Sequence, residues 1–141
     1  MTEGKAKTAA LADTNLFIAL FAGPEHRLHE EAIALFRRVA DGELALTVTS
    51  LVVSELVYAA GPILGWSRAE TSSKLSLLLE ADGLTVPEQA ILQGALELYG
   101  KRRQLDFADA YLASVVLARP AAVASFDTDY DSIEGVTRIS A

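Results

Sequence analysis

The chain of 141 residues contains no cysteine, which excludes disulfide bonds, thiolate catalysis and zinc–thiolate sites. No apolar run approaches the roughly 18 residues that are needed to cross a bilayer. The N-terminal residues 1–8 lead into no long apolar segment of the kind that a secretory signal requires. We therefore expect a cytoplasmic protein with no membrane partner.

Positive charge is also scarce, because the formal net charge is -7. This works against a general affinity for nucleic acid, which depends on lysine and arginine neutralising phosphates. The densest basic cluster is Lys101, Arg102 and Arg103. It is either a solvated helix end, where cations suit the helix dipole, or a contact to phosphate. The acidity does not exclude a nuclease, since bound metal would neutralise several of the acids.

Several catalytic motifs are missing. No glycine-rich phosphate loop precedes Lys and Ser or Thr, which disfavours a nucleotide-dependent enzyme. No nucleophile elbow supports a Ser-His-Asp hydrolase. The acidic run 127–131 fails as a calcium loop, because Ser132 stands in place of the required glycine and Arg138 in place of the closing glutamate.

Hydrophobic residues make up 51% of the chain, enough for a core, and they form short apolar strands that alternate with helical patterns. Strands are expected at residues 8–12, 44–49, 84–86, 121–126 and 136–140. Helices are expected at residues 15–21, 28–40, 51–60, 67–83, 87–99 and 106–118. The alternation predicts a parallel sheet covered on both faces. We expect a flexible tail at 1–8 and one domain at 9–141, since no linker or repeat interrupts the chain.

Four carboxylates, Asp13, Glu55, Asp109 and Asp127, stand in apolar settings at separated places. Asp13 and Asp127 end apolar strands, and the other two lie in apolar helical stretches. A buried carboxylate is costly unless it is paired or bound to metal, and no matching lysine or arginine is near in sequence. The four acids therefore suggest a divalent cation site and hydrolysis of phosphodiesters.

The strand order decides whether these acids meet. Ligands of open α/β sheets bind at the carboxyl ends of the strands, where both Asp13 and Asp127 stand. An order of 3-2-1-4-5 places the first and fourth strands side by side and makes these two residues neighbours. Glu55 follows the second strand and Asp109 precedes the fourth, so both can reach the same edge.

Each acid also has a structural interpretation. Asp13 suits the cap of the helix that follows it. Asp106 and Asp109 have the spacing of a capping box, an interpretation that suits Asp106 better, although Asp106 shares a helical face with Asp109 and can join the acidic pocket. Glu55 is expected to point into a polar pocket inside an apolar shell, because a surface helix would carry more charge.

The segments around the acids resemble a known family. Residues 11–15 (Leu-Ala-Asp-Thr-Asn), 54–57 (Ser-Glu-Leu-Val), 106–113 (Asp-Phe-Ala-Asp-Ala-Tyr-Leu-Ala) and 125–130 (Ser-Phe-Asp-Thr-Asp-Tyr) look like the four acidic motifs of PIN domains. Among PIN domains the chain most resembles VapC-type toxins of prokaryotic toxin–antitoxin pairs. The resemblance runs from about residue 9 to the C-terminus.

The resemblance implies a three-layer α/β/α fold and a ribonuclease that depends on Mg²⁺ or Mn²⁺. Carried over by position, Asp13, Glu55, Asp109 and Asp127 form the acidic quartet. Asn15 supports the first motif, Ser125 stands where the family often has threonine, and Asp129 assists Asp127. The resemblance also implies homodimers and a small antitoxin that blocks the site.

In the hypothesis that follows, Asp13 and Asp127 bind the metal directly, while Glu55 and Asp109 bind through water or orient the attacking water. RNA then needs a local basic surface on a dimer, or a partner. Two alternatives remain open. One is a PIN-like module that has lost catalysis and binds proteins, and the other is a small-molecule phosphohydrolase.

Overall fold

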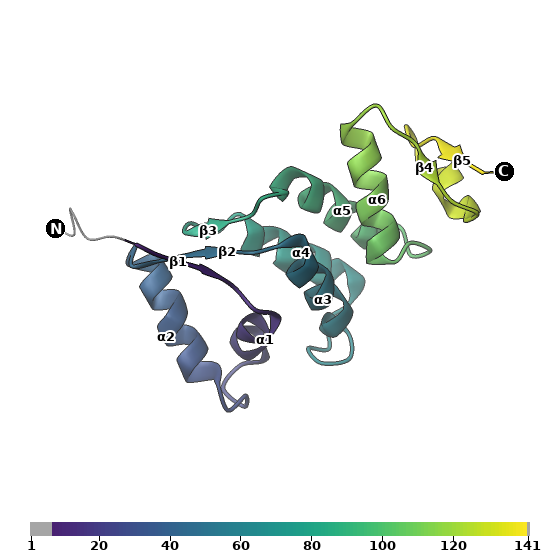
Figure 1. Cartoon of the computed structure of the whole chain (residues 1–141). Coiled ribbons are helices and arrows are strands. Elements are labelled where there is room, and N and C mark those ends of the chain that lie inside the picture. The colour runs from purple at the N-terminus through teal and green to yellow at the C-terminus, as the bar shows by residue number, and fades with distance from the viewer. Residues whose placement is uncertain (1–6, 141) are drawn as a thin grey trace.

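The computed structural model describes residues 7–140 (Figure 1). Residues 1–6 of the predicted tail lie outside the described part, and Thr8 already belongs to the first strand. In chain order the elements are β1 (Thr8–Leu11), α1 (Thr14–Ala22), α2 (His29–Ala40), β2 (Leu44–Thr47), α3 (Ser50–Ala60), α4 (Arg68–Leu79), β3 (Leu84–Thr85), α5 (Gln89–Lys101), α6 (Phe107–Ala118), β4 (Val123–Ala124), the 3-10 helix η1 (Thr128–Ser132) and β5 (Arg138–Ile139).

All strands pair in parallel, and they form two separate sheets. The first has the order β1-β2-β3, with Thr8 opposite Leu44 and Leu46 opposite Leu84. The second pairs β4 with β5. The mixed α/β class with parallel strands is confirmed, and so are the parts 3-2-1 and 4-5 of the predicted order. The predicted junction between β1 and β4 is wrong here, because the two strands belong to different sheets. Figure 1 shows them at opposite ends of the molecule.

Local sequence signals set the helix ends. α4 begins with a capping box, because the Ser67 side chain accepts from the Glu70 backbone while the Glu70 side chain accepts from the Ser67 backbone. α3 is capped by the Thr49 hydroxyl, which accepts from the Val52 backbone N–H over 3.3 Å. None of the helices in the described range combines the length and the apolar character that crossing a lipid bilayer demands.

α6 connects the two halves of the core. Its first turns place Phe107 and Ala110 in the main core with the three-stranded sheet. One turn further, Ala113 belongs to a second buried cluster that also contains Val123 of β4 and Tyr130 of η1. A helix that is apolar on several sides is buried on several sides. The unit formed by β4, η1 and β5 therefore packs on α6 and not on the first sheet.

Candidate active site

An acidic group gathers at the N-terminal end of α6. Asp106 is the N-cap of this helix, and its Oδ1 accepts a hydrogen bond from the Asp109 backbone N–H over 2.8 Å. The capping interpretation of Asp106 is thus confirmed. Asp109 itself is half-buried, and its Oδ1 accepts a hydrogen bond from the Tyr130 hydroxyl over 3.0 Å. The two bonds position the predicted third acid from both sides.

The electrostatic field at this place is negative. Burial raises the pKa of Asp109, and the charges of Asp106 and Asp127 raise it further, while the hydrogen bond from Tyr130 lowers it. The pKa of Tyr130 is also raised, first by burial and then by its hydrogen bond to Asp109. The negative charges of Asp106 and Asp127, two other acids predicted for the site, therefore act on Asp109. A cation placed beside Asp109 would relieve this repulsion.

Asp127 is held by its own loop. It is the N-cap of η1, and its Oδ1 accepts from the Asp129 backbone N–H over 2.9 Å. Its backbone N–H donates to Ser125 Oγ over 3.0 Å. Arg138 donates to both carboxylate oxygens of Asp131 over 2.9 and 3.0 Å and to the Ser125 carbonyl group over 3.1 Å. Ser125 and Asp129, the predicted supporting residues, are thus each hydrogen-bonded to Asp127 within the same loop.

Asp13 lies elsewhere, at the start of α1. Its side chain is exposed, and Oδ1 accepts from the Thr14 backbone N–H over 2.7 Å, so the interpretation as a helix cap is confirmed. Asn15 is exposed in the first turn of the same helix. Thr14 Oγ1 is buried and has no hydrogen-bond partner among the described residues. Apart from this unpaired hydroxyl, the first motif forms a strand-to-helix turn that Asp13 caps.

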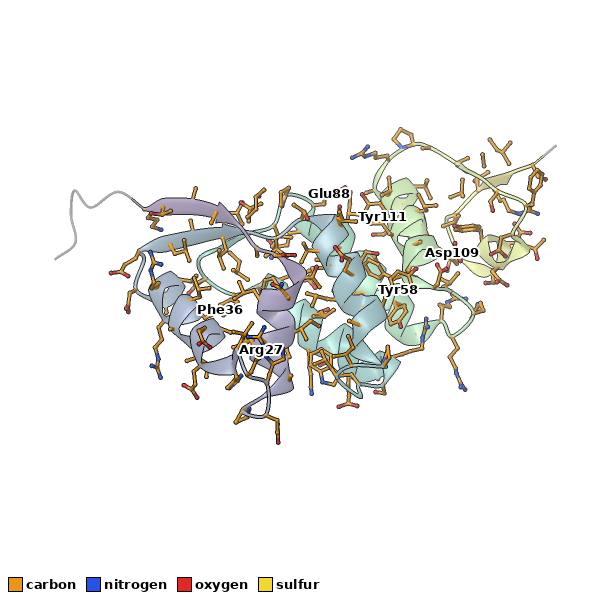
Figure 2. The ribbon with its side chains drawn as sticks, turned by 60° about the horizontal axis from the view of Figure 1, so that its bottom comes forward. Arg27, Phe36, Tyr58, Glu88, Asp109 and Tyr111 are labelled. Carbon is orange, nitrogen blue, oxygen red and sulfur yellow. The ribbon has the colours of Figure 1, made fainter. Side chains whose placement is uncertain are left out.

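Glu55 lies on the exposed side of α3, so the expectation that it points into a buried polar pocket is wrong. The apolar residues around it, such as Leu56 and Val57, bury the other side of the helix. One turn further along α3 is Tyr58, which is 55% exposed and whose pKa is raised by the partial burial of its ring and by the charge of Asp106. Figure 2 shows Tyr58 and Asp109 on the same side of the molecule. The exposed side of α3 thus approaches the acidic group of α6.

The four acids do not converge. Among residues 7–140, no group of three or more histidine or acidic side chains lies close enough to hold a metal ion. Asp109 and Asp127 influence each other, whereas Asp13 is in the half of the molecule that contains the first sheet. The cause is the separation of β1 from β4. The predicted cation cavity is not assembled in this conformation, and the side chains as placed do not fit Mg²⁺ or Mn²⁺.

Comparison with known families decides the classification. The model of the PIN domain family matches residues 10–136. This chain belongs to the PIN domain family. PIN domains are generally nucleases, and they generally use divalent metal ions. Neither the curated proteins nor the solved structures contain a match to this chain. All four predicted acids fall within the matched span of this PIN domain.

The basic cluster of this PIN domain is partly engaged by its own chain. Lys101 Nζ forms an ion pair with Glu97 Oε1 over 2.8 Å, four residues earlier on α5, which fits the interpretation as a helix end. Arg102 donates to the Ser132 carbonyl group over 3.1 Å. Arg103 is exposed and makes no ion pair with any described residue. A contact between phosphate and this cluster remains a prediction.

Two tyrosines of the acidic group were missed by sequence reasoning. Tyr130 lies three residues after Asp127, inside a motif that was recognised, but no spacing rule connects it with Asp109 on α6. Tyr58 follows Glu55 by three residues on the same helical face. Their contacts join segments that are distant along the chain, so only the folded PIN domain shows them.

Proposed function

We propose that this PIN domain is a ribonuclease that depends on Mg²⁺ or Mn²⁺ and hydrolyses phosphodiester bonds of RNA. The observation that supports this most is that the family match spans all four acids, three of which have defined structural positions at helix starts. Carboxylate oxygens are the ligands that these hard cations prefer. We further propose that the chain is a VapC-type toxin, acts in the cytoplasm and is blocked by a small antitoxin.

The residues contribute mainly by positioning. Tyr130 fixes the orientation of Asp109, and the Asp106 cap fixes the backbone beneath it. Asp127 has one oxygen engaged by the η1 backbone, which leaves its second oxygen for a ligand. Because Asp13 and Asp127 are apart in this conformation, the active form requires β1 and β4 to come together.

The decisive experiment is cleavage of a panel of structured RNAs by the purified protein with Mn²⁺ or Mg²⁺, with and without chelator. Asp13→Asn and Asp109→Asn should each lower the cleavage rate by at least about 100-fold, because each removes a charged ligand or an acid–base group. Asp82→Asn, an exposed acid in the loop before β3, is the matched control and should cleave normally. Circular dichroism checks that each variant is folded. Undiminished cleavage by both site variants would remove the proposal.

A second candidate function is a PIN-like module that binds proteins without catalysis. One observation favours it, namely that the acids in the described part of the chain do not form a group able to hold metal. It predicts that the wild-type protein cleaves no RNA with either cation and binds none. Binding without cleavage, measured by fluorescence anisotropy on the same RNA panel, separates the two candidates.

A further inference from the structure

Arg68, the first residue of α4, uses its guanidinium group to bind backbone carbonyl groups of a distant part of the chain. Its Nε donates to the Tyr99 carbonyl group over 3.1 Å, and its Nη2 donates to that of Arg102 over 2.9 Å and to that of Leu105. The guanidinium carbon also lies 3.7 Å from the centre of the Tyr99 ring. One half-buried side chain therefore holds the last turn of α5 and the loop 102–105 that leads to α6.

The contact depends on the geometry of arginine. The last carbonyl groups of a helix have no partner within the helix, and a cation near them interacts favourably with the helix dipole. The planar guanidinium group presents several N–H donors in a fixed arrangement and stacks on an aromatic ring, whereas the ammonium group of lysine is a point charge on a flexible chain. Arg68 forms no ion pair with an acid in the described part of the chain. Its side chain therefore acts on backbone groups.

The loop 102–105 lies directly before the acidic group of α6. Leu105 is followed by Asp106, the N-cap of this helix, whose Oδ1 accepts from the Asp109 backbone N–H over 2.8 Å. The position of the Leu105 carbonyl group thus sets where the cap begins and how the first turn of α6 presents Asp109. This is the first of two connections between Arg68 and that acid.

The second connection runs through packed side chains. Leu105 is 1% exposed and belongs to the buried cluster that contains Tyr130. The Tyr130 hydroxyl donates to Asp109 Oδ1 over 3.0 Å. Because protein interiors are close-packed, a displaced side chain moves its neighbours. A shift of Leu105 would therefore move the tyrosine that orients the Asp109 carboxylate.

The same loop is bonded to the 3-10 helix η1, which carries Tyr130. Arg102 Nη1 donates to the carbonyl group of Ser132, the last residue of η1, over 3.1 Å. Gln104 Nε2 donates to Ser132 Oγ over 3.4 Å. Arg68 therefore holds a segment that reaches both the N-cap of α6 and the end of η1.

We propose that Arg68 is a positioning residue for RNA cleavage, a role that rests on the proposed nuclease function. By holding the loop 102–105, it keeps the Asp109 carboxylate in its reactive orientation. Arg68 does not bond to the acid, because its three acceptors are carbonyl groups of the α5 end and of the loop. Reacting groups must be held to within about 0.5 Å of the productive geometry, so the residues that support them affect the rate.

A purely structural role makes a different prediction. If Arg68 only stabilised the packing of α4 on α5, its loss would lower the free energy of unfolding and leave the folded protein as active as the wild type. A positioning role changes the folded protein itself. Measurements made well below the melting temperature therefore separate the two roles, and circular dichroism shows that each variant is folded under the conditions used.

Arg68→Lys is the most informative substitution, because it keeps the charge but cannot serve three carbonyl groups in one plane. On an RNA that the wild type cleaves with Mn²⁺, kcat should fall by about 10- to 100-fold while KM stays nearly unchanged, since a misplaced acid affects the transition state more than substrate binding. Arg37→Lys, at an exposed position in the last turn of α2, makes the same chemical change and should cleave as the wild type does.

Two further variants address loosening of the α4 start and failure of the lysine variant to fold. Ser67→Ala removes the N-cap next to Arg68 but keeps the guanidinium group, so it should lower stability and leave kcat unchanged. Arg68→Gln keeps two N–H donors without the charge and should lower kcat in the same direction as Arg68→Lys. Wild-type kcat in a folded Arg68→Lys or Arg68→Gln would overturn the proposal, as would an equal loss in Ser67→Ala.

The carboxyl carbon-13 NMR signal of Asp109 at neutral pH reports the placement of this acid without any cleavage. It should shift in Arg68→Lys and stay in place in Arg37→Lys, because only the first change disturbs the hydrogen bond from Tyr130. If the wild type cleaves no RNA but the signal shifts, the nuclease function fails and the placement of Asp109 by Arg68 stands. If the wild type cleaves RNA and the signal does not shift, the role of Arg68 is refuted and the nuclease function stands.

Discussion

The Tyr130 hydroxyl donates a hydrogen bond to Asp109 Oδ1 over 3.0 Å, and so connects the loop after β4 with the first turn of α6. Tyr130 is almost completely buried, whereas Asp109 is at the border of the core. The bond therefore serves two purposes. It ties the C-terminal unit to the rest of the molecule, and it orients a carboxylate that the proposed function assigns to the acidic site.

Removing this hydroxyl should change both properties. In Tyr130→Phe, the pKa of Asp109 should rise further, because the hydrogen bond now lowers it. The free energy of unfolding should fall by about 1–2 kcal/mol, since a half-buried carboxylate loses its partner. Carbon-13 NMR titration and urea unfolding measure the two effects. Tyr111→Phe is the control, because it removes a hydroxyl bonded to Glu88 and should leave Asp109 unchanged. A fall in the Asp109 pKa would show that the tyrosine acts in another way.

The raised pKa of Asp109 predicts a dependence of stability on pH. The native state binds more protons at this group than the unfolded state, so the group stabilises the fold below its unfolded pKa. That contribution is lost as the pH rises through the native pKa. Relative to the wild type, Asp109→Asn should therefore gain stability between about pH 3 and pH 7 in the presence of chelator.

Glu97→Gln provides a control of opposite sign. The hydrogen bond from Lys101 lowers the pKa of Glu97, so its contribution is present above the unfolded pKa and is lost as the pH falls through the native pKa. The glutamine variant should therefore lose stability relative to the wild type over the same range. Urea unfolding at several pH values measures both, and parallel curves for the two variants would contradict the assignments.

The capping box of α4 should be measurable on its own. Ser67→Ala removes the hydroxyl that accepts from the Glu70 backbone over 3.1 Å and should cost about 1 kcal/mol of unfolding free energy. Ser73→Ala, on an exposed position inside the same helix, makes the same chemical change without a cap and should be neutral or slightly stabilising. Equal losses for the two variants would mean that the cap contributes nothing.

The close approach of α5 and α6 depends on Gly94. A Cβ atom at this position would lie 2.6 Å from Ser114 Oγ, which donates to the Ile91 carbonyl group over 2.7 Å. Gly94→Ala should therefore destabilise the fold by about 1–3 kcal/mol through crowding. Gly61→Ala, which meets no atom within 4 Å, is the control and should be tolerated.

A double variant shows whether the crowding is the cause. Ser114→Ala removes the nearest atom and leaves only the Ser114 Cβ at 3.7 Å from the new methyl group, an ordinary contact. Gly94→Ala/Ser114→Ala should then be more stable than the sum of the two single losses predicts. Simple additivity, measured by thermal and urea unfolding, would assign the loss at Gly94 to another origin.

The helix starts of this protein can be predicted from the sequence, because the residues that cap a helix are close together in the chain. The box at Ser67 and the cap at Asp106 each use a side chain and a backbone group only three residues apart. Glu55 shows where such reasoning ends. The apolar neighbours show that one side of α3 is buried, but Glu55 lies on the opposite, exposed side. The sequence of the helix does not indicate which other elements lie near that side.

The sequence by itself determined the succession of strands and helices along the chain and the helix caps at Asp13 and Asp106, since these depend on periodicity and on hydrogen bonds between near neighbours. Only the tertiary structure decided which acids meet. It brought Asp109 to Tyr130 and left β1 apart from β4. The physical reason is that an open strand edge is satisfied equally by a strand of its own chain or of another, so local sequence cannot select the partner.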